Sequence, residues 1–232
     1  QQVIDRIESI NSDGLEVYFD KYPYIASSTS LQSLLSRWVL NGGKTKAMER
    51  LRDPSLVSQI VEEAKLNNEG KDGWNSVLIC QAHCEQFDQF QGKSIGEIAD
   101  YFGVSGDEMF VRLLINGNML TSICNFTMCQ DETDLALTHP LGMPGSDAGC
   151  RAPYGVLSFD TPHPRAYGTF GKYFRDYVKE RQLLSVEDAV YRCTGMPSRV
   201  FGLKNRGVIA KGNHADVLVM DFENFEDKAT FV

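Results

Sequence analysis

The sequence predicts an α/β fold, and three observations support this prediction. Short β-rich runs alternate with amphipathic helical patterns over most of the chain, which is typical of a parallel sheet with covering helices. One apolar run, Leu141 to Pro144, is followed closely by a carboxylate, Asp147, at the end of the strand, where α/β enzymes place acids that do chemistry. The 232 residues, 42% of them hydrophobic, suffice for a sizeable core. We expect one domain, or one and a fraction.

The first 24 residues predict a helix, a strand and a loop. Apolar residues fall on one helical stripe over residues 1–10, and the stretch 11–14 ends that helix. Glu16 to Phe19 is β-rich, and Pro23 stops strand pairing because proline cannot donate to a ladder.

The next hundred residues are dominated by helical signals. The region 27–72 is mostly helical in pattern, with Asp53-Pro54 as a helix cap and first helical position. Ser76 to Cys80 predicts a short strand. Two further helices follow the capping boxes Ser94-Ile-Gly-Glu97 and Ser105-Gly-Asp-Glu108.

The alternation continues to about residue 190. Thr121 to Phe126 predicts a strand, residues 130–137 a helix and Leu141 to Pro144 the strand that leads to Asp147. The aromatic residues from Phe170 to Tyr177 predict one buried helical face, and Ser185 begins another helix. Strands in this arrangement would form a parallel sheet with ligands at their carboxyl ends.

The last section has a different pattern. Gly207 to Asp221 consists of two β-runs joined by a glycine-containing turn, which predicts an antiparallel structure. A complete eight-stranded α/β barrel needs roughly 250 residues, and about four strands are predicted before this section. The chain begins in mid-helix and ends at Val232 without a capping signal. We therefore expect a piece of a longer protein, with most of any barrel outside it.

Composition narrows the classes of partner. A net charge of −8 and a pI near 5.0, without a basic stripe, disfavour nucleic acid and anionic membranes. No apolar run approaches the roughly 20 residues that a membrane-spanning helix needs. Six cysteines are too dilute for a disulfide scaffold, so we expect free thiols and a cytoplasmic protein.

Four motifs carry a resemblance to a known family. They are Tyr22-Pro-Tyr24, Gly145-Ser-Asp147, His163-Pro-Arg165 with Gly168-Thr-Phe170, and the stretch from Arg206-Gly207 to Ala215-Asp216. In order and approximate spacing they resemble the N-acyl-D-amino-acid deacylases, or D-aminoacylases, of the amidohydrolase superfamily. The Gly-Ser-Asp and terminal motifs mark the superfamily, whereas the tyrosine and His-Pro-Arg motifs are closer to the deacylase branch.

The resemblance implies a fold and its domains. The family fold is a metal-containing (β/α)8 barrel with a small β-sandwich. Residues 1–203 would be the C-terminal part of that barrel, with a helical insertion at about 27–118, and residues 204–232 would supply sandwich strands. The family's His-X-His, its metal-binding cysteine and two later histidines would all precede Gln1. The zinc cofactor would thus have most of its ligands outside this chain, and the isolated chain would be inactive.

The resemblance assigns Asp147 as a metal-proximal base and metal ligand. A carboxylate in that position can take a proton from water and pass it to the leaving amine. From the residues alone, Asp147 could equally cap the next helix. The linker between Ala148 and His163 is longer and more apolar than is usual in the family, which leaves the acyl-group and side-chain preference open.

The resemblance makes Arg165 the group that binds the α-carboxylate of the substrate, since its planar guanidinium suits bidentate capture. The alternative is a helix-entry arginine paired with Asp160 or Asp176. Tyr22 would donate its hydroxyl to the developing oxyanion and contact substrate, or would simply be a half-buried aromatic. His163 would contact substrate or orient the loop that it begins.

One further segment could bind metal. Cys80-Gln-Ala-His83-Cys84 suggests a zinc site, but structural zinc needs four ligands and no second pair is present. Buried thiols on a strand are the favoured interpretation.

The functional prediction is a zinc-dependent hydrolase that cleaves the linear amide of N-acyl-D-amino acids, with this small molecule as its partner. Two alternatives remain. One is a cyclic-amide amidohydrolase of the hydantoinase or dihydroorotase type, which would not need the tyrosine and His-Pro-Arg motifs. The other is a catalytically silent fragment that lacks the metal site. Neither the preferred D-amino acid nor the oligomeric state is predicted.

Overall fold

The computed structural model describes residues 1–68, 70, 72–158 and 161–231. The chain divides into two compact units, which we describe separately. Unit 1 comprises Gln1–Tyr24, Cys129–Arg151 and Pro164–Ala229, and unit 2 comprises Ile25–Met128, Ala152–His163 and Thr230–Val232.

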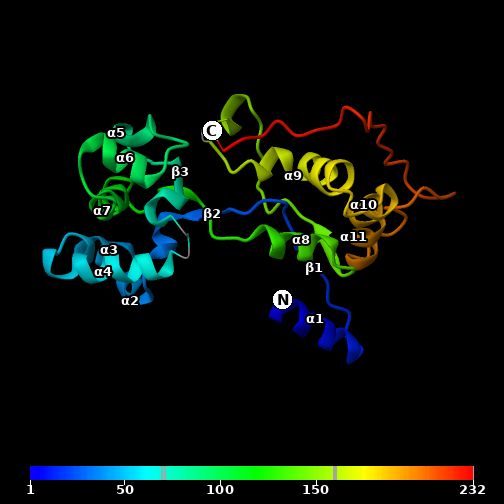
Figure 1. Ribbon diagram of the computed structural model, residues 1–232, viewed down its shortest axis with the longest axis horizontal. Coiled ribbons are helices and arrows are strands. Elements are labelled where there is room, and N and C mark those ends of the chain that lie inside the picture. The colour runs from blue at the N-terminus through cyan, green and yellow to red at the C-terminus, as the bar shows by residue number, and fades with distance from the viewer. Residues whose placement is uncertain (69, 71, 159–160, 232) are drawn as a thin grey trace. The chain divides into compact units, whose positions relative to one another are not determined.

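Unit 1 is mainly helical and contains two short strands (Figure 1). Its elements are α1 (Gln2–Ser12), β1 (Phe19–Lys21), α8 (Gln130–Thr138), β5 (Gly142–Pro144), α9 (Arg165–Tyr173), the π-helix η4 (Phe174–Glu180), α10 (Val186–Cys193) and α11 (Gly195–Val200). Each element lies within a few residues of its predicted position, apart from α11, which the sequence did not indicate.

The two strands of unit 1 pair in parallel, with Phe19 opposite Gly142 and Lys21 opposite Pro144. Gly142 is needed at this point because a Cβ there would lie 2.2 Å from the carbonyl oxygen of Ala136 in α8. The parallel arrangement is therefore confirmed for this pair. β1 begins at Phe19, three residues after the start that the sequence predicts.

The core of unit 1 forms where α8, the α9 and η4 segment, and α10 meet. The predicted aromatic face is buried at Tyr173, Phe174 and Tyr177, whereas Phe170 is 45% exposed. The helix changes to π-helical winding after Tyr173, and the predicted face residues on that segment remain buried. The remaining buried members of this core are Leu137, Val178 and Ala189.

Unit 2 contains the larger apolar core. Its elements are β2 (Ser27–Ser30), η1 (Leu31–Leu34), α2 (Arg37–Leu40), α3 (Gly43–Leu51), α4 (Pro54–Asn67), η2 (Gly73–Ser76), β3 (Val77–Gln81), α5 (Glu85–Asp88), α6 (Ile95–Phe102), α7 (Gly106–Asn116), β4 (Ser122–Asn125) and η3 (Gly155–Leu157). This unit includes the region that the resemblance implies is a helical insertion.

Helix boundaries in unit 2 follow the local signals. The Asp53 carboxylate accepts a hydrogen bond from the Ser55 backbone, and Pro54 is the first residue of α4. Both hydrogen bonds of the capping box between Ser94 and Glu97 are present at the start of α6. At the start of α7 the Ser105 hydroxyl accepts a hydrogen bond from the Glu108 backbone, but the Glu108 carboxylate pairs with Arg112, so only half of the second predicted capping box forms. The three predicted helix starts are confirmed.

The strands of unit 2 form an antiparallel sheet in the order β2, β4, β3. The prediction that the runs at 76–80 and 121–126 belong to a parallel sheet is therefore wrong. β2, whose sequence is Ser-Ser-Thr-Ser, pairs with β4 although it lacks the alternation of apolar and polar residues that indicates a strand. Hydrogen bonding to a neighbouring strand, rather than its own pattern, makes it a strand.

The predicted antiparallel pair in Gly207 to Asp221 is also wrong, because the structure has no strand there. Figure 1 shows this part of the chain without strand arrows. Ile209 and Val219 are 92% and 93% exposed. A β-run becomes a strand only when a partner accepts and donates its backbone hydrogen bonds, and the described residues provide no partner here.

All six cysteines are free thiols, as expected. Among the described helices, none is both long and apolar enough to cross a bilayer.

Candidate functional site

Asp147 lies on the loop that follows β5, as predicted. Its carboxylate side chain is 66% exposed, and its backbone has a φ of +46°, a left-handed conformation that aspartate tolerates better than most residues. The next helical element begins only at Gly155, and α9 begins after Pro164. Asp147 is therefore not a helix cap, and that alternative is wrong.

Arg165 is the first residue of α9 and is 8% exposed. Its Nη2 lies 3.0 Å from Oδ2 of Asp147. Asp176, one alternative partner, instead pairs with Lys172 and Arg175. The other alternative partner, Asp160, lies outside the described residues. The structure thus joins the two residues that the sequence singled out as base and carboxylate binder.

Tyr22 follows β1 directly and is 8% exposed. The guanidinium carbon of Arg165 lies 4.6 Å from the centroid of its ring, within the range of a cation–π contact. Three predicted site residues, Tyr22, Asp147 and Arg165, therefore form one cluster in unit 1. An exposed carboxylate, a buried guanidinium and a phenol in this arrangement can bind an anion and move a proton.

Lys21 is a member of this cluster that sequence reasoning missed. Its Nζ lies 3.9 Å from the centroid of the Tyr22 ring and donates to the Tyr24 carbonyl oxygen at 3.3 Å. Burial, and then the charge of Arg165, lower the pKa of Lys21 to about 8, while Asp147 acts in the opposite direction. Its position directly before the tyrosine motif was the signal available in the sequence.

His163 belongs to unit 2. It is 3% exposed, its Nε2 lies 2.9 Å from the carbonyl oxygen of Ala26, and its ring packs edge-on against Phe231. These contacts favour the interpretation that His163 orients its loop. Its role in substrate binding stays a prediction.

The Cys80 segment matches the interpretation of buried thiols. Cys80 lies in β3, and its Sγ is 3.1 Å from that of Cys124 in β4. No group of three or more histidine, cysteine, aspartate or glutamate side chains in the described part of the chain could hold a metal ion. The described residues therefore do not form a zinc site by themselves, and Asp147 offers a single carboxylate.

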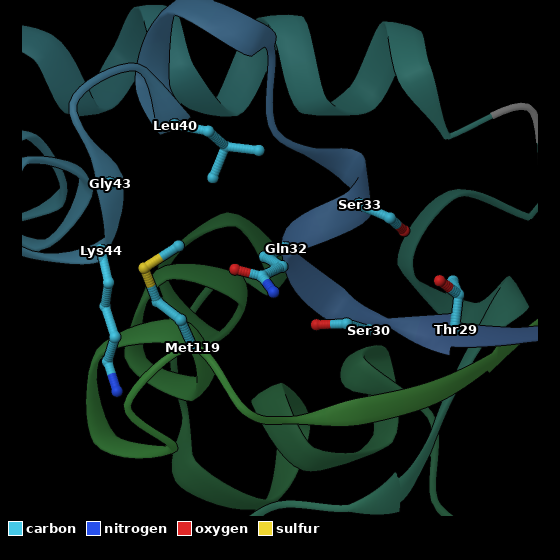
Figure 2. A pocket seen from close by; sticks show the side chains of 8 residues that line it. All are labelled: Thr29, Ser30, Gln32, Ser33, Leu40, Gly43, Lys44 and Met119. Carbon is cyan, nitrogen blue, oxygen red and sulfur yellow. The ribbon is translucent and has the colours of Figure 1, made fainter.

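Unit 2 has an open hollow of about 450 Å³, shown in Figure 2. It lies beside α3 and is lined by Thr29, Ser30, Gln32, Ser33, Leu40, Gly43, Lys44 and Met119. None of the predicted site residues is among them. The lining has hydroxyls, an amide and one amine, but no carboxylate or imidazole for acid–base chemistry.

Known proteins similar to this chain include deacylases of N-acyl-D-amino acids and dihydroorotases. The chain is 35% identical over 141 residues to an N-acyl-D-aspartate deacylase of Alcaligenes xylosoxydans, and 30% identical over 216 residues to a D-aminoacylase of the same organism. These matches cover 60% and 93% of the chain, but only 26% and 34% of the two enzymes. No protein-family model matches the chain.

A solved structure shows the same relationship. It is an N-acyl-D-glutamate deacylase of Bordetella bronchiseptica, complexed with zinc and a phosphonate that mimics the tetrahedral intermediate of its reaction. The TM-score is 0.69 at 28% identity, over 98% of this chain and 38% of that one. The resemblance that the motifs carry is thereby confirmed, and the chain spans only 26% to 38% of the length of these enzymes.

Proposed function

We propose that this chain, a relative of the N-acyl-D-amino-acid deacylases, is the C-terminal portion of a zinc-dependent hydrolase. The enzyme would cleave the linear amide of N-acyl-D-amino acids and release a carboxylate and a D-amino acid. The observation that carries the proposal is the cluster of Asp147, Arg165 and Tyr22, which come from three separate parts of the sequence. A cytoplasmic location is part of the proposal and is supported by the six free thiols.

Asp147 is the proton carrier in this proposal. It is exposed enough to reach a water molecule, and a carboxylate can accept the proton of the attacking water and pass it to the leaving amine. Zinc, when bound, polarises the amide carbonyl and lowers the pKa of water. Asp147 would be one ligand of that zinc, and the others would come from residues outside this chain.

Arg165 binds the α-carboxylate of the substrate in this proposal. The Arg165 guanidinium already holds one carboxylate, that of Asp147, and its planar fork suits carboxylates, so the α-carboxylate of the substrate can take the place of Asp147 there. The Tyr22 ring, packed against the guanidinium, keeps it in place, and the Tyr22 hydroxyl donates to the oxyanion.

The cluster of Tyr22, Asp147 and Arg165 is also relevant to the two alternative functions, a cyclic-amide amidohydrolase and a catalytically silent fragment. A hydantoin ring has no carboxylate for Arg165 to bind, so a buried arginine beside Tyr22 disfavours a hydantoinase. Dihydroorotate does carry a carboxylate, so Arg165 does not distinguish a dihydroorotase from a deacylase. A silent fragment would have no need of an exposed aspartate held by that same arginine. Neither alternative has an observation of its own in the structure.

The experiment compares the complete protein that carries this chain with the same protein bearing Asp147→Ala. We expect zinc-dependent release of D-amino acids from N-acetyl substrates, lost in the variant while the fold is retained. The 232-residue chain alone should be inactive. Turnover that survives Asp147→Ala, or turnover by the chain alone, would refute the assigned roles.

A further inference from the structure

Two thiols of unit 2 lie directly against each other. Cys80 is in β3 and Cys124 is in β4, and their Sγ atoms are 3.1 Å apart. The sulfurs of a disulfide lie about 2.05 Å apart, so a shift of roughly 1 Å would bring this pair to bonding distance. The two cysteines are 44 residues apart in the sequence, so the fold brings them together.

The strand register explains the approach of the two sulfurs. β3 is an edge strand of its sheet, whose order is β2, β4, β3. The register between β3 and β4 shifts between Ile79 and Gln81, which places Cys80 at a β-bulge. A bulge changes the direction of the side chain that it carries. Here the Cys80 side chain reaches the sulfur of Cys124 on the central strand.

We propose that Cys80 and Cys124 form a reversible oxidation site, at which hydrogen peroxide converts the two thiols to a disulfide that stabilises unit 2. In the first step one thiolate attacks a peroxide oxygen, the O–O bond breaks, and a sulfenic acid and water result. In the second step the other thiol attacks the sulfenic sulfur, the S–S bond forms, and the S–O bond breaks to release water. Two thiols thus lose two electrons and two protons, and one peroxide becomes two waters.

Burial favours bonding within the pair. Cys80 and Cys124 are 6% and 3% exposed, so a bulky thiol or a second protein chain cannot approach their sulfurs closely. Peroxide is small, and a local opening of an edge strand would admit it. Once one sulfur is oxidised, the neighbouring sulfur is therefore the available nucleophile. Cys129 and Cys150, in contrast, are exposed to any thiol in solution.

The bond would constrain a large part of unit 2. The closed ring from Cys80 to Cys124 contains α5, α6 and α7. A disulfide across a ring of this size lowers the entropy of the unfolded chain and so stabilises the fold. In a reducing compartment such a bond persists only while oxidant is present. The site would therefore make the stability of unit 2 respond to peroxide, whether or not the protein is a hydrolase.

The test uses the complete protein that carries this chain, treated with hydrogen peroxide and compared with the reduced protein. After the remaining thiols are alkylated, mass spectrometry of a non-reduced digest should find a peptide that links Cys80 to Cys124, and dithiothreitol should remove this link. The melting temperature of the oxidised protein should exceed that of the reduced protein by about 3 °C or more. No substrate is needed, so the outcome is independent of the proposed hydrolysis.

Two variants serve as a matched pair. Cys124→Ala should lose both the linked peptide and the rise in melting temperature, whereas Cys84→Ala, which removes a half-buried thiol, should keep both. The peptide map of the wild type decides the question even if Cys124→Ala does not fold. Oxidation of Cys129 and Cys150 without a link between Cys80 and Cys124 would overturn the proposal. A link that leaves the melting temperature unchanged would overturn the stabilising role.

Discussion

The Arg165 guanidinium lies 3.0 Å from the Asp147 carboxylate, although the arginine side chain is nearly buried and the aspartate side chain is two-thirds exposed. The two groups belong to different elements, the start of α9 and the loop after β5. The contact holds the carboxylate at the edge of the parallel pair, where the proposed chemistry takes place. Exposure of one partner keeps the contribution of the ion pair to stability small.

Asp147→Asn should therefore separate activity from stability. We expect a loss of kcat of about 10² to 10⁴, the range for general acid–base groups. The free energy of unfolding should change by less than about 1 kcal/mol. Initial rates measure the change in kcat, and urea denaturation measures the change in the free energy of unfolding. Asp216→Asn is the matched control, because Asp216 forms an ion pair with Arg206 and is 62% exposed. A large stability loss in Asp147→Asn would mean that the residue has a mainly structural role.

Tyr22→Phe should lower kcat and leave the fold intact. The phenylalanine ring keeps the contacts with Lys21 and Arg165 but loses the hydroxyl. Removal of one oxyanion donor costs about 10² to 10³ in kcat. Tyr18→Phe is the control, since the Tyr18 hydroxyl bonds to Arg199 and is not part of the cluster. Unchanged kcat in Tyr22→Phe would exclude the oxyanion role.

Lys21 predicts a pH dependence of stability. Its pKa is about 8 in the folded chain, against 10.5 for an ordinary lysine, so the unfolded chain binds more protons between these values. The free energy of unfolding should therefore gain a contribution that rises from about pH 8 towards 10.5. Urea unfolding at several pH values measures the free energy of unfolding of the wild type and of Lys21→Met. The wild-type value minus the Lys21→Met value should become more positive between about pH 8 and 10.5. Parallel curves would contradict a lowered pKa.

Gly171→Ala should destabilise unit 1. A Cβ at Gly171 would lie 2.9 Å from the backbone nitrogen of Asp227, which cannot rotate away as a side chain can. Overpacking of this kind costs about 1–3 kcal/mol, more than the gain of about 1 kcal/mol from replacing a helical glycine. Gly149→Ala, which meets nothing within 4 Å, should change stability by less than about 0.5 kcal/mol. Thermal melts compare the melting temperatures of Gly171→Ala and Gly149→Ala. Equal melting temperatures in the two variants would contradict the prediction.

Local signals in the sequence were sufficient for much of the fold. Asp53, Ser94 and Ser105 begin their helices as predicted because a cap depends only on residues two or three positions away. Asp147 was found for a similar reason, since an apolar strand followed by small residues and a carboxylate is a local pattern. The order of the motifs then sufficed to indicate the family.

The tertiary structure decided what depends on distant residues. The antiparallel sheet needed β2, whose polar sequence becomes a strand only through its bonds to β4. Lys21 joined the site because folding brings α9 and its Arg165 to the end of β1, and no local pattern encodes that approach. The fold also decided that Arg165 pairs with Asp147, because only folding brings the start of α9 to the loop after β5. The sequence by itself indicated which side chains to propose for the site, and the fold decided which of them meet, because contact energies between distant residues exist only once the chain is folded.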